Sequence, residues 1–209
     1  MLLSDPTPLI TSPVIPVVTI DRADQAVPLA RALLAGGLNV VEITLRTPAA
    51  LDAARAIIAE VDDVIVGIGT ITKPLDVTHA VDAGADFLVS PGTPANLAQA
   101  LADAPVPAMP GCATASEAMA LAALGFPVLK LFPAEPSGGV RWLKAMAEPL
   151  PDIRYCPTGG VNGDNAPSYL ALGNVLAVGG SWVAPRQAIA AGDFAGITAR
   201  ARAAAALRG

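Results

Sequence analysis

The feature that most constrains the fold is a repeated alternation between short runs rich in β-branched residues and longer stretches rich in alanine and leucine. Runs of the first kind are typical of buried strands, and stretches of the second kind are typical of helices. A chain that alternates in this way forms a parallel sheet, because each helix returns the chain to the start of the next strand. Eight such units follow one another without a break in composition, which predicts a single (β/α)8 TIM barrel domain over residues 1–209. An open, doubly wound sheet is the alternative architecture.

The expected strands are the runs 14–20, 40–45, 64–70, 87–90, 106–110, 128–135, 155–158 and 175–180. The expected helices lie near residues 23–34, 49–58, 74–83, 94–102, 115–124, 140–146, 166–172 and 197–207. With 209 residues, the barrel is near the lower end of the ~200 to over 400 residues that this fold spans.

Composition and charge argue against several classes of protein. The mean hydropathy is +0.54, but the apolar residues come in short runs that cannot cross a bilayer. A net charge of -5 and a pI of about 4.7 argue against nucleic-acid and membrane partners. Residues 1–6 show no secretory pattern, and Cys112 and Cys156 form no paired motif, so we expect a cytoplasmic protein without a structural disulfide.

Lys130 stands in the middle of an apolar strand. Side chains alternate between the two faces of a strand, so Lys130 shares a face with Val128 and Phe132. An ammonium group there loses its hydration, and burial favours the neutral amine, which is a nucleophile toward carbonyl groups. The alternative is a structural lysine that reaches solvent or pairs with a carboxylate.

Other polar residues lie near strand ends, where barrel enzymes carry their chemistry. In the second strand, Glu42 and Arg46 share the inward face with Thr44. The same alternation places Thr70 on one face of the third strand with Val66 and Ile68. In the seventh strand it places Thr158 on the same face as Cys156. A cation and an anion on inward faces indicate a functional site, and a buried Lys130–Glu42 pair without chemistry is the structural alternative.

Two glycine pairs lie at the ends of the last two strands. Gly159 and Gly160 follow Thr158 at the end of the seventh strand, and Gly179 and Gly180 end the eighth, followed by Ser181. Glycine lets backbone N–H groups approach an anion, and TIM barrels often bind phosphate at these two loops. Each pair alone is also compatible with an ordinary turn, but together they favour a phosphorylated substrate.

Six motifs, in order along nearly the whole chain, resemble the family of 2-keto-3-deoxy-6-phosphogluconate (KDPG) aldolase and 4-hydroxy-2-oxoglutarate aldolase. They are VEITLRT at 41–47, VGIGT at 66–70, VSPG at 89–92, KLFPAE at 130–135, CPTGGV at 156–161 and GGSW at 179–182. The resemblance implies a class I aldolase, generally a homotrimer, that cleaves KDPG reversibly into pyruvate and glyceraldehyde 3-phosphate. Residues 110–114 and the short amino terminus depart mildly from the family pattern.

The resemblance also implies roles for individual residues. Lys130 would form a Schiff base with the C2 carbonyl, and Glu42 would be the general acid and base. Arg46 and Thr70 would hold the carboxylate end, and Phe132 and Thr158 would line the same region. The phosphate would be held by Gly159, Gly160, Gly180 and Ser181.

This chemistry needs no metal or other cofactor. A protonated imine at C2 is an electron sink for cleavage of the C3–C4 bond. His79, the single histidine, lies in an expected helix and makes a histidine-rich zinc site improbable.

Three other readings remain open. A sister aldolase would prefer 2-keto-3-deoxy-6-phosphogalactonate or 4-hydroxy-2-oxoglutarate. A phosphate-binding barrel isomerase would use Glu42 as base without a covalent intermediate. A barrel protein without catalytic activity would bind a sugar phosphate only as a sensor.

Overall fold

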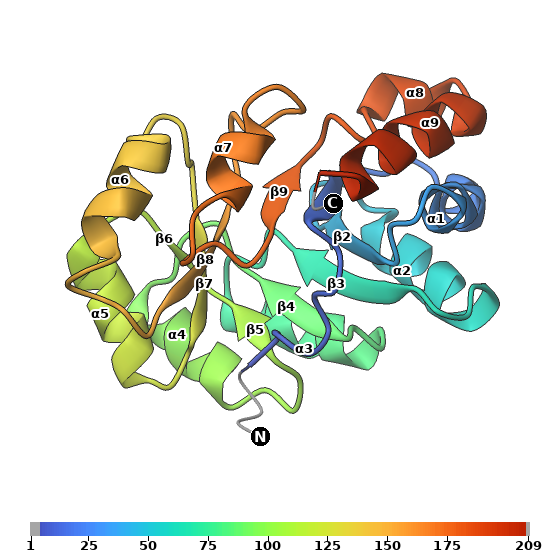
Figure 1. Cartoon of the computed structure of the whole chain (residues 1–209). Helices are drawn as coiled ribbons and strands as arrows, with labels where there is room; N and C mark the ends of the chain where they lie inside the picture. Colours follow the sequence, from blue (N-terminus) through green and yellow to red (C-terminus); the bar gives the residue numbers. More distant parts are fainter. Residues whose placement is uncertain (1–4, 208–209) are drawn as a thin grey trace.

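The computed structural model describes residues 5–207 of the chain. Helices surround a curled wall of parallel strands, as Figure 1 shows. Residues 1–4 and 208–209 lie outside the described residues, and so does most of the segment 1–6 on which the expectation about a secretory signal rests. No helix within residues 5–207 is long and apolar enough to cross a membrane.

Within residues 5–207 the strands are β1 Val14–Val18, β2 Val40–Thr44, β3 Ile65–Gly69, β4 Phe87–Val89, β5 Ala108–Met109, β6 Gly111–Cys112, β7 Val128–Leu131, β8 Arg154–Pro157 and β9 Val178–Gly180. The helices of the same residues are the 3-10 helix η1 Ala23–Gln25 and the α-helices α1 Ala26–Ala35, α2 Ala50–Glu60, α3 Pro74–Asp82, α4 Ala95–Ala102, α5 Ala115–Ala123, α6 Gly139–Met146, α7 Ala166–Leu170, α8 Arg186–Ala190 and α9 Phe194–Ala205.

The predicted alternation of strand and helix is confirmed. Every expected strand region contains a strand, and every expected helix is present, the first of them as η1 followed by α1. The helix α8 was not predicted, because its five residues are too few to show a helical repeat in the sequence. The strand expected at 106–110 is divided into β5 and β6.

The prediction of a closed (β/α)8 barrel is wrong. The strands form a six-stranded sheet in the order β5-β4-β3-β2-β1-β9 and a separate three-stranded sheet in the order β6-β7-β8. β5 pairs with β4 and β6 pairs with β7, and Pro110, which has no N–H to donate, lies between them. Between β8 and β9 the described residues form only two isolated bridges, Tyr155 to Val175 and Thr158 to Gly179.

Side chains join the two sheets beside Pro110. Thr93 Oγ1 donates to the Gly111 carbonyl at 2.9 Å, so Ser90 Oγ is the donor in its 2.8 Å contact with Thr93 Oγ1. Ser90 Oγ also accepts from the Gly111 N–H at 3.0 Å. A Cβ atom on Gly111 would lie 2.4 Å from the Pro91 backbone, so only glycine fits this close approach. This network replaces the missing strand pairing between β4 and β6.

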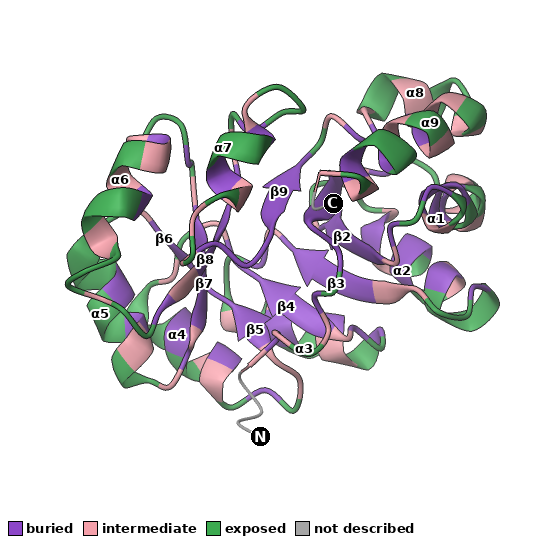
Figure 2. Ribbon diagram, in the orientation of Figure 1, coloured by how far each residue is buried: buried purple, intermediate pink, exposed green. Residues whose placement is uncertain are grey.

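Apolar side chains form one cluster on each face of the strands, and Figure 2 shows the strands buried and the outer helix faces exposed. Val41, Ile43 and Leu129 pack with helix residues in the outer cluster. Val40 and Val128 belong to the inner cluster, which also contains Ile10 from the segment before β1. The predicted parity of the second and sixth strands is therefore confirmed, and it directs Glu42 and Lys130 inward.

Candidate active site

A buried ion pair joins the two sheets inside the curl. Lys130 Nζ on β7 lies 3.1 Å from Glu42 Oε1 and 3.3 Å from Oε2 on β2. The two side chains are 4% and 3% exposed. Burying a charge is costly unless the charge is paired and hydrogen-bonded, so neither group can be removed without leaving the other uncompensated.

The Glu42 carboxylate has room because the inward positions beside it on the neighbouring strand β3 are glycines. On β3, a Cβ atom at Gly69 would lie 2.0 Å from Glu42 Oε1, and one at Gly67 would lie 2.2 Å from the Phe87 ring. Both glycines point inward, since Val66 and Ile68 pack in the outer cluster. Sequence reasoning missed Gly69 as a site residue. The signal was that glycine occupies two alternate positions of this strand, 67 and 69, which leaves that part of one face without side chains.

The lysine lies against an aromatic ring and a thiol. Its Nζ is 5.4 Å from the centroid of the Phe132 ring, within cation–π range. Cys156 pairs with Lys130 across β7 and β8, and burial raises the pKa of the Cys156 thiol to about 12. Thr158, buried on the same side, donates to the Cys156 carbonyl at 3.4 Å. Cys156 therefore stays a neutral thiol beside the ion pair at neutral pH.

Arg46 and Thr70 are brought together as the sequence predicted, but not by strand parity. Arg46 Nε donates to Thr70 Oγ1 at 3.2 Å, and the Arg46 side chain is exposed. The expectation that Thr70 shares a face with Val66 and Ile68 is wrong, because those two residues face the helices. Thr70 has φ 60°, so the chain turns out of the strand there and redirects its side chain.

The glycines that follow β8 and that end β9 occupy positions that need glycine. Gly159 and Gly160 have φ of 98° and 83°, a region that residues with a Cβ rarely occupy. A Cβ atom on Gly180 would lie 1.8 Å from the Trp182 ring. Ser181, which follows Gly180, is exposed.

A neighbouring pair supports the Gly159–Gly160 loop. The Glu135 N–H donates to the Gly159 carbonyl at 3.0 Å, and the Tyr169 hydroxyl on α7 donates to Glu135 Oε1. A Cβ atom on Gly160 would lie 2.6 Å from Glu135 Cγ. Burial, followed by the hydrogen bond to Glu135, raises the pKa of Tyr169 above its ordinary range. Sequence reasoning assigned no role to Glu135 or Tyr169, because their contact depends on chain segments 34 residues apart.

A cavity of about 360 Å³ opens where β1, β2 and β9 end, and its lining includes Thr19, Arg46, Ser181, Trp182, Pro185 and Arg186. It brings together Arg46 and Ser181, which were predicted to hold opposite ends of the substrate. Lys130, Glu42, Thr70 and Phe132 are not among the lining residues of this cavity. Thr19 Oγ1 lies 3.1 Å from Thr44 Oγ1 and is the donor, because Thr44 donates its own proton to the Val18 carbonyl at 2.7 Å.

Among the described residues, His, Cys, Asp and Glu side chains form no group of three or more that could hold a metal ion. His79 lies exposed on α3, as expected. Cys112 and Cys156 are both free and buried.

An amine and a carboxylate in direct contact inside the curl, beside a loop suited to an anion, are a combination that can perform acid–base and imine chemistry on a carbonyl compound. Residues 7–200 match the family model of KDPG and KHG aldolase, and the chain belongs to this family. The resemblance predicted from the six motifs is thus confirmed.

Bacterial relatives and solved structures are similar to this chain over nearly their full length. The chain is 46% identical to the KHG/KDPG aldolase of Escherichia coli K12 over 194 residues, which cover 93% of this chain and 91% of the relative. It is 48% identical to the 2-dehydro-3-deoxy-phosphogluconate aldolase of Dickeya dadantii, with the same coverage of 93% and 91%. The KDPG aldolase of Legionella pneumophila, solved with pyruvate as a covalent carbinolamine, has a TM-score of 0.92 at 42% identity and covers 94% of this chain and 95% of its own.

Proposed function

We propose that the chain is a class I aldolase that cleaves KDPG reversibly into pyruvate and glyceraldehyde 3-phosphate, with Lys130 as the amine that forms the imine. The observation that carries the proposal is the buried contact of 3.1 Å between Lys130 Nζ on β7 and Glu42 Oε1 on β2. The Legionella relative, which holds pyruvate as a carbinolamine, supports the same chemistry here.

The reaction begins when Glu42 accepts a proton from the Lys130 ammonium group, which frees the nitrogen lone pair. The amine attacks C2 of the substrate, and a proton passes from the attacking nitrogen to the former carbonyl oxygen, which gives a neutral carbinolamine. Glu42 then returns a proton to the C2 hydroxyl group, which leaves as water and gives the protonated imine. A single carboxylate can serve both steps because it contacts the amine directly.

Carbon–carbon cleavage uses the same pair. Glu42, acting through a water molecule, removes the proton of the C4 hydroxyl group as the C3–C4 bond breaks. The bonding electrons move to the imine nitrogen, so glyceraldehyde 3-phosphate leaves and the enamine of pyruvate remains on Lys130. Protonation at C3 and hydrolysis release pyruvate and restore the amine.

The other predicted residues bind the two ends of the substrate in this proposal. Arg46, oriented by Thr70, presents a planar fork that suits the carboxylate at C1. Phe132 and Thr158 border the reacting carbon beside Lys130. Gly159, Gly160, Gly180 and Ser181 hold the phosphate through backbone N–H groups and a hydroxyl group.

Cleavage of KDPG, measured as pyruvate released, tests the proposal. We expect turnover by the natural chain and a loss of at least about a thousandfold in Lys130→Ala. Lys144→Ala is the matched control, because Lys144 lies exposed on α6, and it should behave as the natural chain. Full activity of Lys130→Ala would contradict the assignment.

We further propose that the reaction is independent of metal ions and that the chain acts as a homotrimer in the cytoplasm. Prolonged dialysis against a strong chelator should leave kcat unchanged, since no step above requires a Lewis acid. Light scattering should give a mass three times the 21.0 kDa of one chain. Unfolding in one transition would support a single domain over residues 1–209.

A further inference from the structure

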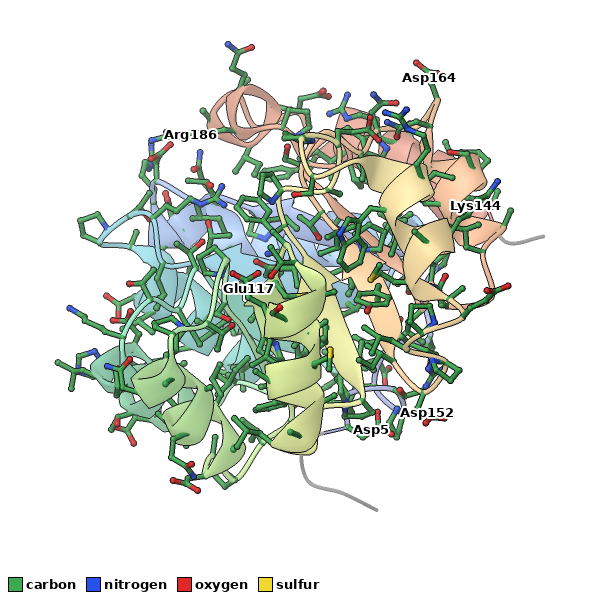
Figure 3. All side chains as sticks on the ribbon, turned by 90° about the vertical axis from the view of Figure 1, so that its left-hand side faces the viewer. Asp5, Glu117, Lys144, Asp152, Asp164 and Arg186 are labelled. Carbon is green, nitrogen blue, oxygen red and sulfur yellow. The ribbon has the colours of Figure 1, made fainter. Side chains whose placement is uncertain are left out.

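An arginine that no motif singles out lies at the mouth of the cavity. Arg186 is the first residue of α8, after Pro185, and it lines the cavity with Arg46 and Ser181. In Figure 3 it lies at the same end of the molecule as Asp164, which follows β8, and away from Asp5 and Asp152, which precede the strands. Arg186 is therefore on the face where the strands end and where the proposed chemistry takes place.

Two contacts hold Arg186 and its helix in place. Arg186 Nε donates to Asp21 Oδ2 at 2.7 Å, and Nη2 donates to Asp21 Oδ1 at 2.5 Å. Gln25 Nε2 donates to the Ile189 carbonyl on α8 at 3.1 Å. This bidentate pair uses one edge of the guanidinium group and leaves the Nη1 hydrogens available to a ligand.

The charge of the cavity lining suits a phosphate group. The cavity lining within residues 5–207 contains Arg46 and Arg186 and neither an aspartate nor a glutamate; Asp21, which pairs with Arg186 and offsets part of its charge, is not a lining residue. The whole chain carries a net charge of -5, so this cavity departs from the overall balance. Arginine presents a planar fork of donors that matches phosphate oxygens.

A purely structural role explains the pair poorly. The Arg186 and Asp21 side chains are 62% and 39% exposed, and exposed ion pairs contribute little to stability. Arg22 and Asp24 form a similar exposed pair in the same segment, but Arg22 does not line the cavity. The feature that distinguishes Arg186 is the cavity beside it.

We propose that Arg186, positioned by Asp21, is a phosphate-binding residue that makes the enzyme prefer phosphorylated 2-keto sugar acids over the same acids without phosphate. The proposal rests on the proposed aldolase function and adds a residue to its phosphate site. It leaves the imine chemistry of Lys130 unchanged.

The test compares KDPG with 2-keto-3-deoxygluconate, which is the same sugar acid without phosphate. In Arg186→Ala the ratio of kcat/KM for the two substrates should fall about tenfold, mainly through KM for KDPG. Arg186→Lys, which keeps the charge but loses the fork, should recover part of the preference. Arg22→Ala is the matched control and should keep the natural ratio.

A binding measurement separates failure of this proposal from failure of the proposed function. Calorimetric titration with inorganic phosphate should show binding at least about fivefold weaker in Arg186→Ala than in the natural chain. Equal phosphate binding and an unchanged substrate ratio would overturn the role of Arg186. Absence of KDPG cleavage by the natural chain would overturn the aldolase assignment, and the phosphate titration would still test Arg186.

Discussion

The six-stranded and three-stranded sheets make different contributions to one site. The six-stranded sheet supplies Glu42 from β2, and the three-stranded sheet supplies Lys130 from β7. The sheets meet at the Ser90 network on one side and at two isolated bridges on the other. The distance between Glu42 and Lys130 is therefore set by seams between sheets and not by a continuous ladder of strand pairs.

The two sheets also differ in how they create the space around Glu42 and around Lys130. In the six-stranded sheet, Gly67 and Gly69 leave room for a carboxylate. In the three-stranded sheet, Lys130 is packed beside Cys156 and the Phe132 ring. The carboxylate side depends on missing side chains, whereas the lysine side depends on apolar ones.

Besides the loss of Lys130, the largest effect should come from removing the charge that the six-stranded sheet contributes. Glu42→Gln keeps the size of the side chain but cannot accept a proton, so kcat should fall by about a hundredfold to ten-thousandfold. Steady-state cleavage of KDPG measures the loss, and Glu60→Gln at the exposed end of α2 is the control. Near-normal rates in Glu42→Gln would contradict the role of Glu42 and show that another group transfers the protons.

A smaller but more specific effect should follow from filling the space beside Glu42. The added Cβ in Gly69→Ala would lie 2.0 Å from Glu42 Oε1, so the carboxylate must shift from its position in the ion pair with Lys130. We expect kcat to fall by about tenfold to a hundredfold, because small misplacements of catalytic groups are costly. Gly173→Ala, where no atom lies within 4 Å of the added carbon, should have no effect on the rate.

Weakening the contact between the two sheets at Ser90 should lower the stability of the fold more than the rate of the reaction. Ser90→Ala leaves the buried Gly111 N–H without its acceptor, which should lower the free energy of unfolding by about 1–3 kcal/mol. Urea denaturation measures the change, with Ser116→Ala on the exposed face of α5 as the control. An equal stability for both variants would show that the seam does not depend on Ser90.

Alkaline pH should weaken the three-stranded sheet, which carries both thiols of the chain. Burial raises the pKa of Cys112 on β6 and Cys156 on β8 from 9.0 to about 12. Unfolded thiols ionise first, so the stabilisation is present below pH ~9 and is lost as the pH rises toward ~12. Each thiol should cost about 1.4 kcal/mol per pH unit in that window.

Denaturation at several pH values tests this slope. The double variant with alanine at both positions should lose stability less steeply between pH ~9 and ~10 than the natural chain, even if it is less stable at pH ~7. Identical slopes would contradict the link between the thiols and the alkaline loss.

The strand and helix regions could be predicted because their hydrophobic patterns are local. The sequence could not show that the barrel stays open, because this depends on how Pro110 and Gly111 divide one expected strand between two sheets. Glu42 and Lys130 could be found from strand parity and motifs. Thr70 was identified through its motif although its expected face was wrong, since its side chain is redirected by φ 60°.

Arg186 shows where sequence reasoning ends. Its helix is short, and its partner Asp21 is 165 residues away. Only the folded chain places this pair beside Arg46 and Ser181.

Borohydride reduction in the presence of pyruvate, followed by intact mass and peptide mapping, tests the central claim most directly. The chain has three lysines, Lys73, Lys130 and Lys144, so the modified position can be assigned without ambiguity. We predict one reduced pyruvyl adduct, on Lys130. A folded protein that carries no adduct on Lys130 with pyruvate in excess would contradict the imine mechanism.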